Sequence, residues 1–181
     1  MIVTKTPFRI SLLGGGSDLQ AFYQRSPGAC LSFTINKYMY ISSHQYFEND
    51  QYRLKYSKTE TVNNVDQIQH PIFREALKTV NTNAGIELSS IADIPAGTGM
   101  GSSSSFTVGV LQNLFTRKNQ FIDKYQLANL ACQIEIEKLK EPIGKQDQFA
   151  ASFGGLNTFR FLSHGAVNVE SLNLSAEAFN E

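Results

Sequence analysis

The chain has only two cysteines, Cys30 and Cys132, among its 181 residues. Two cysteines are too few for a disulfide framework, and these two lack the paired spacing of metal ligands. The three histidines, His44, His70 and His164, are scattered and are given no functional role. A cysteine-based metal site is therefore not expected, and a reducing, cytoplasmic location is the default.

An excess of either charge is also missing, because 16 basic residues balance 16 acidic ones. Nucleic-acid-binding domains normally carry a basic excess, so nucleic acid is not an expected partner. No stretch approaches the roughly 20 apolar residues of a membrane span, and the N-terminal apolar run, Ile10–Leu13, is too short for a signal peptide. With 41% apolar residues, the composition predicts a soluble globular protein that contacts no membrane.

Glycine, by contrast, is concentrated in residues 95–105, where Gly97, Gly99 and Gly101 run into four consecutive serines. Such a loop exposes backbone N–H groups and hydroxyls without side-chain bulk, which suits a polyphosphate and its metal ion. The residues that follow have the spacing of a buried helical face: Phe106, Val110, Leu111, Leu114 and Phe115. We predict a helix that begins within the serines, with Ser102 or Ser103 as its N-cap. A flexible Gly/Ser linker would have polar sequence on both sides and is the less favoured interpretation.

Two familiar phosphate-binding loops do not fit this stretch. A Walker A loop needs a lysine before Ser or Thr, and no lysine occurs from Pro95 to Ser105. The dinucleotide fingerprint needs an acidic residue about twenty positions on, where this chain has Arg117. Both motifs are therefore excluded.

Elsewhere the pattern predicts strands early in the chain and helices late, which favours the α+β class. The expected strands are 2–13, a hairpin of 29–35 and 38–46 joined near Asn36-Lys37, then 52–56, 86–91 and 156–162. Besides the helix after the serines, the expected helices are 18–25 with Ser17 as its cap, 71–80, 124–138 and 148–153.

Glu135 is a candidate for chemistry because it lies in the helix over 124–138, on the side of Ala128, Ala131 and Cys132. A carboxylate over apolar neighbours is costly unless it is paired or bound to a metal. The simpler alternative is a peripheral glutamate paired with Lys138 at i,i+3, and the residue alone favours it.

Three more charged residues allow both structural and functional interpretations. Asp147 precedes a short helix, so it is either the N-cap or a carboxylate that accepts a hydroxyl proton. Arg9 interrupts an apolar strand and needs a partner, either a structural ion pair or a phosphate. Asp18, after the first glycine run, could cap a helix or bind sugar hydroxyls.

Three motifs in this order resemble those of the GHMP kinase superfamily, named for galactokinase, homoserine kinase, mevalonate kinase and phosphomevalonate kinase. Residues 95–104 are similar to its central motif Pro-x-x-x-Gly-[Leu/Met]-Gly-Ser-Ser-[Ser/Ala], and Pro7, Arg9 and Gly14 match its N-terminal motif. In galactokinase-like members a helical Glu precedes a catalytic Asp by twelve residues, as Glu135 precedes Asp147 here. Within the superfamily, residues 14–18, 29–38, 144–148 and 153–157 are similar to the D-glycero-D-manno-heptose 7-phosphate kinases.

The resemblance implies a fold and a reaction. The fold is the GHMP kinase N-terminal domain, of the ribosomal protein S5 domain 2-like type, in which helices pack on a mixed sheet. It would occupy residues 1–181, with the C-terminal domain of the family absent from this chain. The implied reaction is ATP-dependent phosphorylation of the anomeric hydroxyl of a sugar phosphate, D-glycero-D-manno-heptose 7-phosphate giving the 1,7-bisphosphate. The alternatives are a kinase of the fucose, galactose or mevalonate type, or a truncated, non-catalytic nucleotide-binding module.

The same resemblance implies roles for single residues. The ATP phosphates would lie against Pro95, Gly97, Thr98, Gly99, Met100, Gly101, Ser102, Ser103 and Ser104. Glu135 with Ser103 or Ser104 would hold Mg²⁺. Asp147 would be the catalytic base, and Arg9 would lower its pKa or stabilise the transferred group. The substrate would contact Gly15, Gly16, Ser17 and Asp18. Apart from the resemblance, the place of Lys145 two residues before Asp147 makes it a candidate partner of the 7-phosphate.

Overall fold

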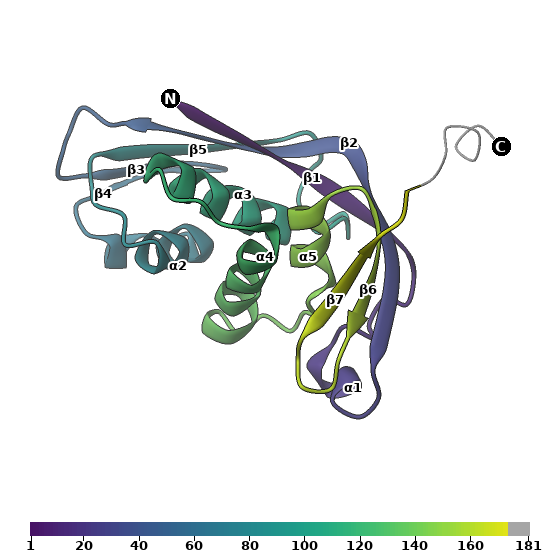
Figure 1. The fold of residues 1–181 in the computed structure, drawn as a ribbon. Coiled ribbons are helices and arrows are strands. Elements are labelled where there is room, and N and C mark those ends of the chain that lie inside the picture. The colour runs from purple at the N-terminus through teal and green to yellow at the C-terminus, as the bar shows by residue number, and fades with distance from the viewer. Residues whose placement is uncertain (174–181) are drawn as a thin grey trace.

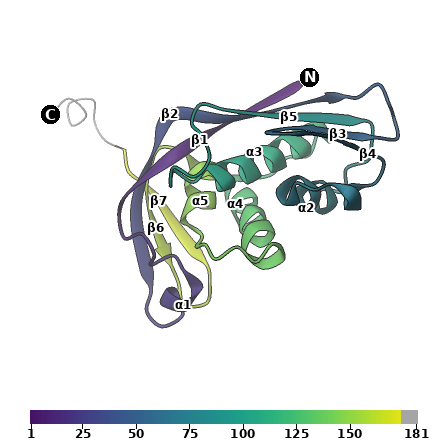
Figure 2. The same cartoon turned by 180° about the vertical axis from the view of Figure 1, so that it is seen from behind.

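A computed structural model describes residues 1–173 and confirms the α+β class, with helices packed on one face of a mixed seven-stranded sheet (Figures 1 and 2). The strands are β1 (Ile2–Leu13), β2 (Gly28–Gln45), β3 (Tyr52–Lys55), β4 (Thr59–Val62), β5 (Ile86–Ala92), β6 (Leu156–Phe161) and β7 (Val167–Ser171). The helices are α1 (Gln20–Tyr23), η1 (Val65–Gln67), α2 (Pro71–Thr79), α3 (Ser102–Arg117), α4 (Lys124–Cys132), η2 (Gln133–Lys138) and α5 (Gln146–Phe153).

The long strand β2 is central to the sheet and pairs with three other strands, β1, β5 and β6. The strands follow the order β4-β3-β5-β2-β6-β7, and β1 pairs with β2 in addition. The C-terminal part of β2, Met39–Gln45, pairs with β5, while its N-terminal part, Gly28–Phe33, pairs with β6. Only β3 and β5 run parallel in the described part of the chain, which makes the sheet mixed. One strand therefore joins two separate groups of strands.

The predicted hairpin over 29–46 is wrong, because β2 continues through Asn36-Lys37 without a turn. The pairing of β1 with β2 shifts register there: Pro7 lies opposite Tyr38, but Arg9 lies opposite Thr34. One residue of β1, Phe8, thus faces the three residues 35–37 of β2. The polar pair that suggested a turn marks a bulge, a feature that re-aims neighbouring side chains. Arg9 is the residue of β1 that follows this bulge.

Helix α3 lies close against β1 and β2 because Gly109 has no side chain. A Cβ at this position would come within 2.9 Å of Thr6 Oγ1 and 3.2 Å of Ile41 Cγ1. Thr4 Oγ1 donates to the Gly109 carbonyl at 2.9 Å, and Asn113 Nδ2 donates to the Ile41 carbonyl at the same distance. Leu111 and Leu114 of the same helix are fully buried, and the burial of each contributes about 1.5–3 kcal/mol to folding. Within residues 1–173, no helix combines the length and the hydrophobicity needed to cross a membrane.

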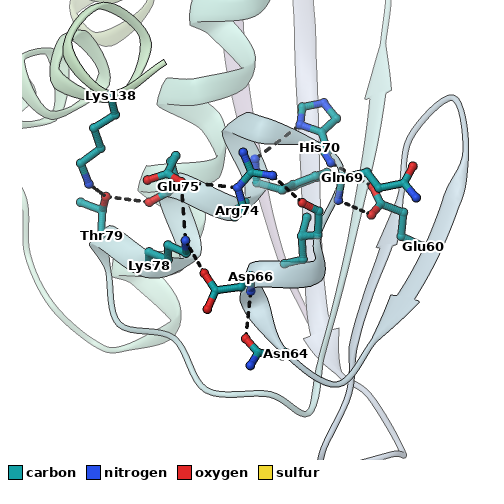
Figure 3. A network of polar contacts seen from close by, with 12 residues as sticks. Glu60, Asn64, Asp66, Gln69, His70, Arg74, Glu75, Lys78, Thr79 and Lys138 are labelled. Carbon is teal, nitrogen blue, oxygen red and sulfur yellow. Dashed lines mark hydrogen bonds and ion pairs between the residues drawn. The ribbon is translucent and has the colours of Figure 1, made fainter. Parts of the chain in front are cut away.

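The start of α2 is fixed by a polar network (Figure 3). The Glu60 carboxylate accepts the backbone N–H groups of Gln69 at 2.6 Å and His70 at 3.1 Å. His70 Nδ1 accepts the N–H of Phe73 at 3.4 Å and so caps the helix. The His70 ring also stacks on Phe106, 4.9 Å between ring centres, four residues beyond the first serine of α3. This network ties α2 to the beginning of α3.

Most of the predicted elements are confirmed, with two differences in the helices. The helix expected over 18–25 is the single turn α1, whose N-cap is Leu19 and not Ser17. The helix expected over 124–138 is present, but its last six residues, η2, have π-helical hydrogen bonding. Strands β4 and β7 have no counterpart in the sequence prediction.

Candidate active site

Arg9 and Asp147 lie together, although they come from opposite ends of the chain. Arg9 Nε and Nη2 lie 2.8 and 2.6 Å from the same carboxylate oxygen, Asp147 Oδ1. The Arg9 side chain is 15% exposed and that of Asp147 is 27% exposed. Asp147 is in the first turn of α5 and is not its N-cap, so the capping alternative is wrong. The structure therefore gives Arg9 its required partner and leaves Asp147 Oδ2 outside this ion pair.

The glycine loop, residues 95–101, is held against this ion pair. Arg9 Nη1 donates to the Gly99 carbonyl at 2.7 Å, and the Arg9 N–H donates to Met100 at 3.3 Å. A Cβ on Gly101 would lie 3.2 Å from Asp147 Oδ2. The three alternate glycines have φ values of 83°, 72° and 73°, a left-handed conformation that other residues rarely adopt. Apart from Gly101 and Met100, the loop residues named by the sequence prediction, including Pro95 and Thr98, are exposed.

The serines at the start of α3 do not cap the helix, as the sequence predicted, but bind Glu135. The N-cap of α3 is Gly101, not Ser102 or Ser103, and its backbone is left-handed. The Ser103 and Ser104 hydroxyls instead donate to Glu135, at 2.5 and 2.9 Å. Ser102 is the first residue of the helix and is half-buried. The serine run therefore joins the glycine loop to a carboxylate.

Glu135 is fully buried, and the alternative of a peripheral pair with Lys138 is wrong. Its carboxylate accepts hydrogen bonds from Ser103, Ser104 and also Gln148, whose Nε2 lies 2.8 Å from Oε2. Lys138 turns away and donates to Thr79 Oγ1 at 2.7 Å (Figure 3). Glu135 belongs to the π-helical segment η2, and such segments often occur at functional sites.

Gln148 is a member of this site that sequence reasoning missed. The residue is fully buried next to Asp147, and its Oε1 has no hydrogen-bond partner among the described residues. The available signal was an amide placed directly before the apolar run Phe149–Ala151. A polar side chain at the edge of a buried helical face needs a polar partner, and here that partner is Glu135.

Burial raises the pKa of both carboxylates. For Glu135, burial raises the pKa, the hydrogen bonds from Ser103, Gln148 and Ser104 lower it, and the charge of Asp147 raises it again. For Asp147, burial also has the largest effect; Arg9 lowers the pKa as expected, but the net shift is upward. A raised pKa moves a carboxylate towards the operating pH of a general base, and at Glu135 it means that the hydrogen bonds do not fully offset the cost of burying the charge.

Asp18 fixes the beginning of α5. Its Oδ2 accepts the Gln146 N–H at 3.0 Å, and its Oδ1 accepts the Gly16 N–H at 3.2 Å. A Cβ at Gly144 would come 1.9 Å from Asp18 Oδ2, so only glycine allows this approach. The carboxylate thus connects the first glycine loop to the turn of helix that carries Asp147.

The first glycine loop, residues 14–18, is closed by Ser17. Ser17 Oγ lies 2.7 Å from the Gly14 carbonyl and 2.9 Å from the Ala29 carbonyl, and it accepts the Ala29 N–H at 3.1 Å. Gly15 and Gly16 are exposed beside it. Ser17 therefore stabilises the loop, and the two glycines leave its outer surface open.

Lys145 is the N-cap of α5, two residues before Asp147. Its Nζ donates to the Gly165 carbonyl at 2.6 Å, in the turn between β6 and β7, and lies 5.5 Å from the centre of the Tyr23 ring. The sequence prediction placed Lys145 with the substrate. The structure places it beside α1, which follows the loop of Asp18 directly.

The residues around Glu135 fit a magnesium ion. Among the described residues, no group of three His, Cys, Asp or Glu side chains could hold a metal. Mg²⁺, however, usually takes one or two carboxylates, with phosphate oxygens and water completing its shell. Glu135, Ser103 and Ser104 supply oxygen atoms only, beside a loop suited to phosphate. The hard oxygen donors suit Mg²⁺ and not a soft metal.

The chain is similar in sequence and in fold to known proteins. A family model described as the GHMP kinases N terminal domain matches residues 50–155. A D-glycero-alpha-D-manno-heptose 7-phosphate kinase of Campylobacter jejuni is 30% identical over 184 residues, covering 96% of this chain and 54% of the relative. A galactokinase of Pyrococcus furiosus is 29% identical over 181 residues, covering 93% and 49%. The crystal structure of a D-glycero-D-manno-heptose 1-phosphate kinase from Bacteroides thetaiotaomicron has a TM-score of 0.87 and 26% identity, covering 97% of this chain and 61% of that one.

The chain spans about half the length of the curated relatives it matches. The family model covers more than half of the chain, and it includes the glycine loop, Glu135 and Asp147. Arg9 and the loop of Asp18 lie outside the matched range, but both are in direct contact with residues inside it. The chain therefore belongs to the GHMP kinase family, through the N-terminal domain of that family.

Proposed function

We propose that this chain is the N-terminal domain, with residues 1–181 as its extent, of an ATP-dependent kinase that phosphorylates the anomeric hydroxyl of a sugar phosphate. D-glycero-D-manno-heptose 7-phosphate is the first candidate substrate, and the 1,7-bisphosphate is its product. The observation that carries the proposal is the Arg9–Asp147 ion pair held against the glycine loop. It joins a candidate base to a candidate phosphate site at the start of a 16-residue helix.

In the proposed reaction, the sugar oxygen attacks the γ-phosphorus of ATP while the bond to the bridging oxygen of ADP breaks. Asp147 takes the hydroxyl proton, and its raised pKa suits that task. Arg9 holds Asp147 in place and adds positive charge next to the transferred group. The loop of residues 95–101 and the start of α3 orient the nucleotide phosphates.

Glu135, with Ser103 or Ser104, would hold Mg²⁺, which neutralises phosphate charge when it is bound. Gln148 keeps the Glu135 carboxylate in position while a serine hydroxyl turns away from it. Asp18, Gly15, Gly16 and Ser17 form the loop on which we place the sugar. Asp18 would keep its bond to Gln146 and accept a sugar hydroxyl with its remaining lone pairs.

The test is an ADP-release assay of the longer protein with a panel of acceptors that includes heptose 7-phosphate, galactose, fucose and mevalonate. Asp147→Asn should lower kcat at least a thousandfold and leave binding of Mg-ATP measurable by calorimetry. The matched control is Asp50→Asn, an exposed residue in the connection between β2 and β3, which should keep full activity. Full activity of Asp147→Asn would remove this residue from the mechanism.

A galactokinase is the second candidate, because the Pyrococcus furiosus relative is nearly as similar as the heptose 7-phosphate kinase. Turnover of galactose and not of the heptose would favour it. A non-catalytic nucleotide-binding module is the remaining alternative. It predicts binding of Mg-ATP by the chain and no ADP release by the longer protein with any acceptor.

A further inference from the structure

A polar hollow lies at the N-terminus of α5, the helix that carries Asp147, and has no role in the chemistry described above. It has a volume of about 350 Å³ and is enclosed by α1, by α4 and η2, and by the turn between β6 and β7. Lys145 lines it, and we name it the Lys145 hollow. A volume of this order suits a small ligand group.

Lys145 is the main charge of this hollow. Its ammonium group has three donors, and its described hydrogen bond, to the Gly165 carbonyl, engages one of them. In the part of the chain that the structure describes, no carboxylate oxygen lies within 4.0 Å of Lys145 Nζ. The residue is half-buried. Charges taken out of water are normally paired with an opposite charge. The half-buried Lys145 ammonium has no such partner among the described residues, so an anion in the hollow would complete the pair.

The other lining residues suit an oxyanion. The amide side chains of Gln20, Gln24, Asn129 and Gln133 supply neutral donors, and His164 lies in the β6–β7 turn. One carboxylate, that of the exposed Glu137, also lines the hollow and opposes an anion there. The hollow therefore offers one unpaired cation and several neutral donors against a single acidic group.

The position of the hollow relative to Asp147 suggests which anion it takes. Asp18 accepts the N–H of Gln146, the residue between Lys145 and Asp147, so the first glycine loop adjoins the chain segment that carries both side chains. Helix α1 begins directly after this loop and lines the hollow through Gln20 and Tyr23. A sugar that rests on the loop with its anomeric hydroxyl at Asp147 can therefore direct its far end towards α1.

We infer that the Lys145 hollow binds the phosphate monoester that the sugar substrate carries before it is phosphorylated. This inference rests on the proposed sugar-phosphate kinase function and adds the residues that would select a phosphorylated sugar over a free one. Lys145 contacts the phosphate with the donors that Gly165 leaves free. The ammonium group of Lys145 lies over the Tyr23 ring, 5.5 Å from its centre, and this cation–π contact helps to keep it in the hollow.

The kinetic test compares heptose 7-phosphate with the dephosphorylated heptose in the longer protein. Lys145→Met keeps most of the length of the side chain and removes the charge, so KM for the phosphorylated sugar should rise ten- to hundredfold. KM for the dephosphorylated sugar and for Mg-ATP should stay unchanged. Lys145→Arg should restore most of the loss, and Glu137→Gln should lower KM for the phosphorylated sugar several-fold. Lys138→Met, which removes the same charge outside the hollow, is the matched control.

An equal loss with both sugars would overturn the inference, because it would mean that Lys145 only ties α5 to the β6–β7 turn. A second measurement needs no turnover and separates this inference from the proposed function. Glycerol 3-phosphate is titrated into the protein while the amide NMR signals of His164 and Gly165 are followed. Saturable shifts that Lys145→Met abolishes support the hollow, even if no heptose is phosphorylated. Unchanged signals up to millimolar concentrations overturn it.

Discussion

Replacing Glu135 with glutamine should make the folded chain more stable at neutral pH. The side chain has no exposed surface, and removing a carboxylate from water costs several kcal/mol. Three hydrogen bonds, each contributing about 1.5–3 kcal/mol to a charged group, oppose that cost. The raised pKa of Glu135 means that burial prevails. Glutamine has nearly the same shape, and the Ser103 hydroxyl can turn to accept its amide hydrogen.

We expect Glu135→Gln to increase the free energy of unfolding by about 1–3 kcal/mol at pH 7, as when a buried charge is replaced by a neutral group of similar volume. For a chain of this size the melting temperature should rise by roughly 2–12 °C. The sign of the pH dependence follows from the raised pKa. Between the pKa of Glu135 in the unfolded chain and its higher pKa in the folded protein, the folded protein binds more protons. The loss of stability that the buried charge causes in the wild type is therefore fully present above the folded pKa. It disappears as the pH falls to the usual pKa of glutamate.

The assay is urea unfolding of both proteins at pH 7.5 and at pH 4, monitored by circular dichroism. Glu137→Gln is the matched control, because it removes an exposed charge two residues away and should change stability by less than about 0.5 kcal/mol. A Glu135→Gln protein less stable than wild type at pH 7.5 would refute the reasoning. An equal gain at both pH values would refute the assignment of that gain to charge.

Four further predictions test other parts of the structure. Arg9→Met in the longer protein should move the acid limb of the kcat/KM profile to higher pH, because the guanidinium lowers the pKa of Asp147; Arg9→Lys should move it less. Gly109→Ala should lower stability by about 1–3 kcal/mol in thermal unfolding, since the new methyl group meets Thr6 and Ile41. Burial lowers the pKa of His70, so the free energy of unfolding should fall as the pH drops below about 6.5. In urea titrations at several pH values, His70→Asn should reduce that fall. Burial raises the pKa of Cys30 to about 12, so iodoacetamide at pH 8 should modify this thiol only after unfolding, as mass spectrometry of peptides can check.

The sequence predicted the elements that depend on local pattern. The glycine loop and the buried face of α3 were readable because left-handed glycines and helical periodicity leave direct marks on the chain. The bulge in β2 was not readable, because Asn36-Lys37 looks the same in a turn and in a bulge. The choice between them depends on β1, which lies alongside.

The charged residues that meet at the candidate site were named from the sequence, whereas Gln148 and the contacts between the residues were not. Arg9 and Glu135 were named as charged residues in apolar surroundings, and Asp147 as an acid before a short helix, signals that need no tertiary structure. That Glu135 bonds to Ser103 and not to Lys138 depends on where α3 and η2 meet. The π-helical turn of η2 and the contact from Asp18 to Gln146 are likewise products of packing, for which the sequence has no local marker.

The shared strand β2 has a consequence for synthesis of the protein. Its first half, Gly28–Phe33, pairs with β6, which is made more than a hundred residues later. At about 5–20 residues per second, this edge waits roughly 6–25 s for its partner, whereas β5 reaches the second half much sooner. An unpaired edge is a template for pairing with other chains. During translation, the half of the molecule that carries the Asp18 loop is therefore the last to close and the most exposed to aggregation.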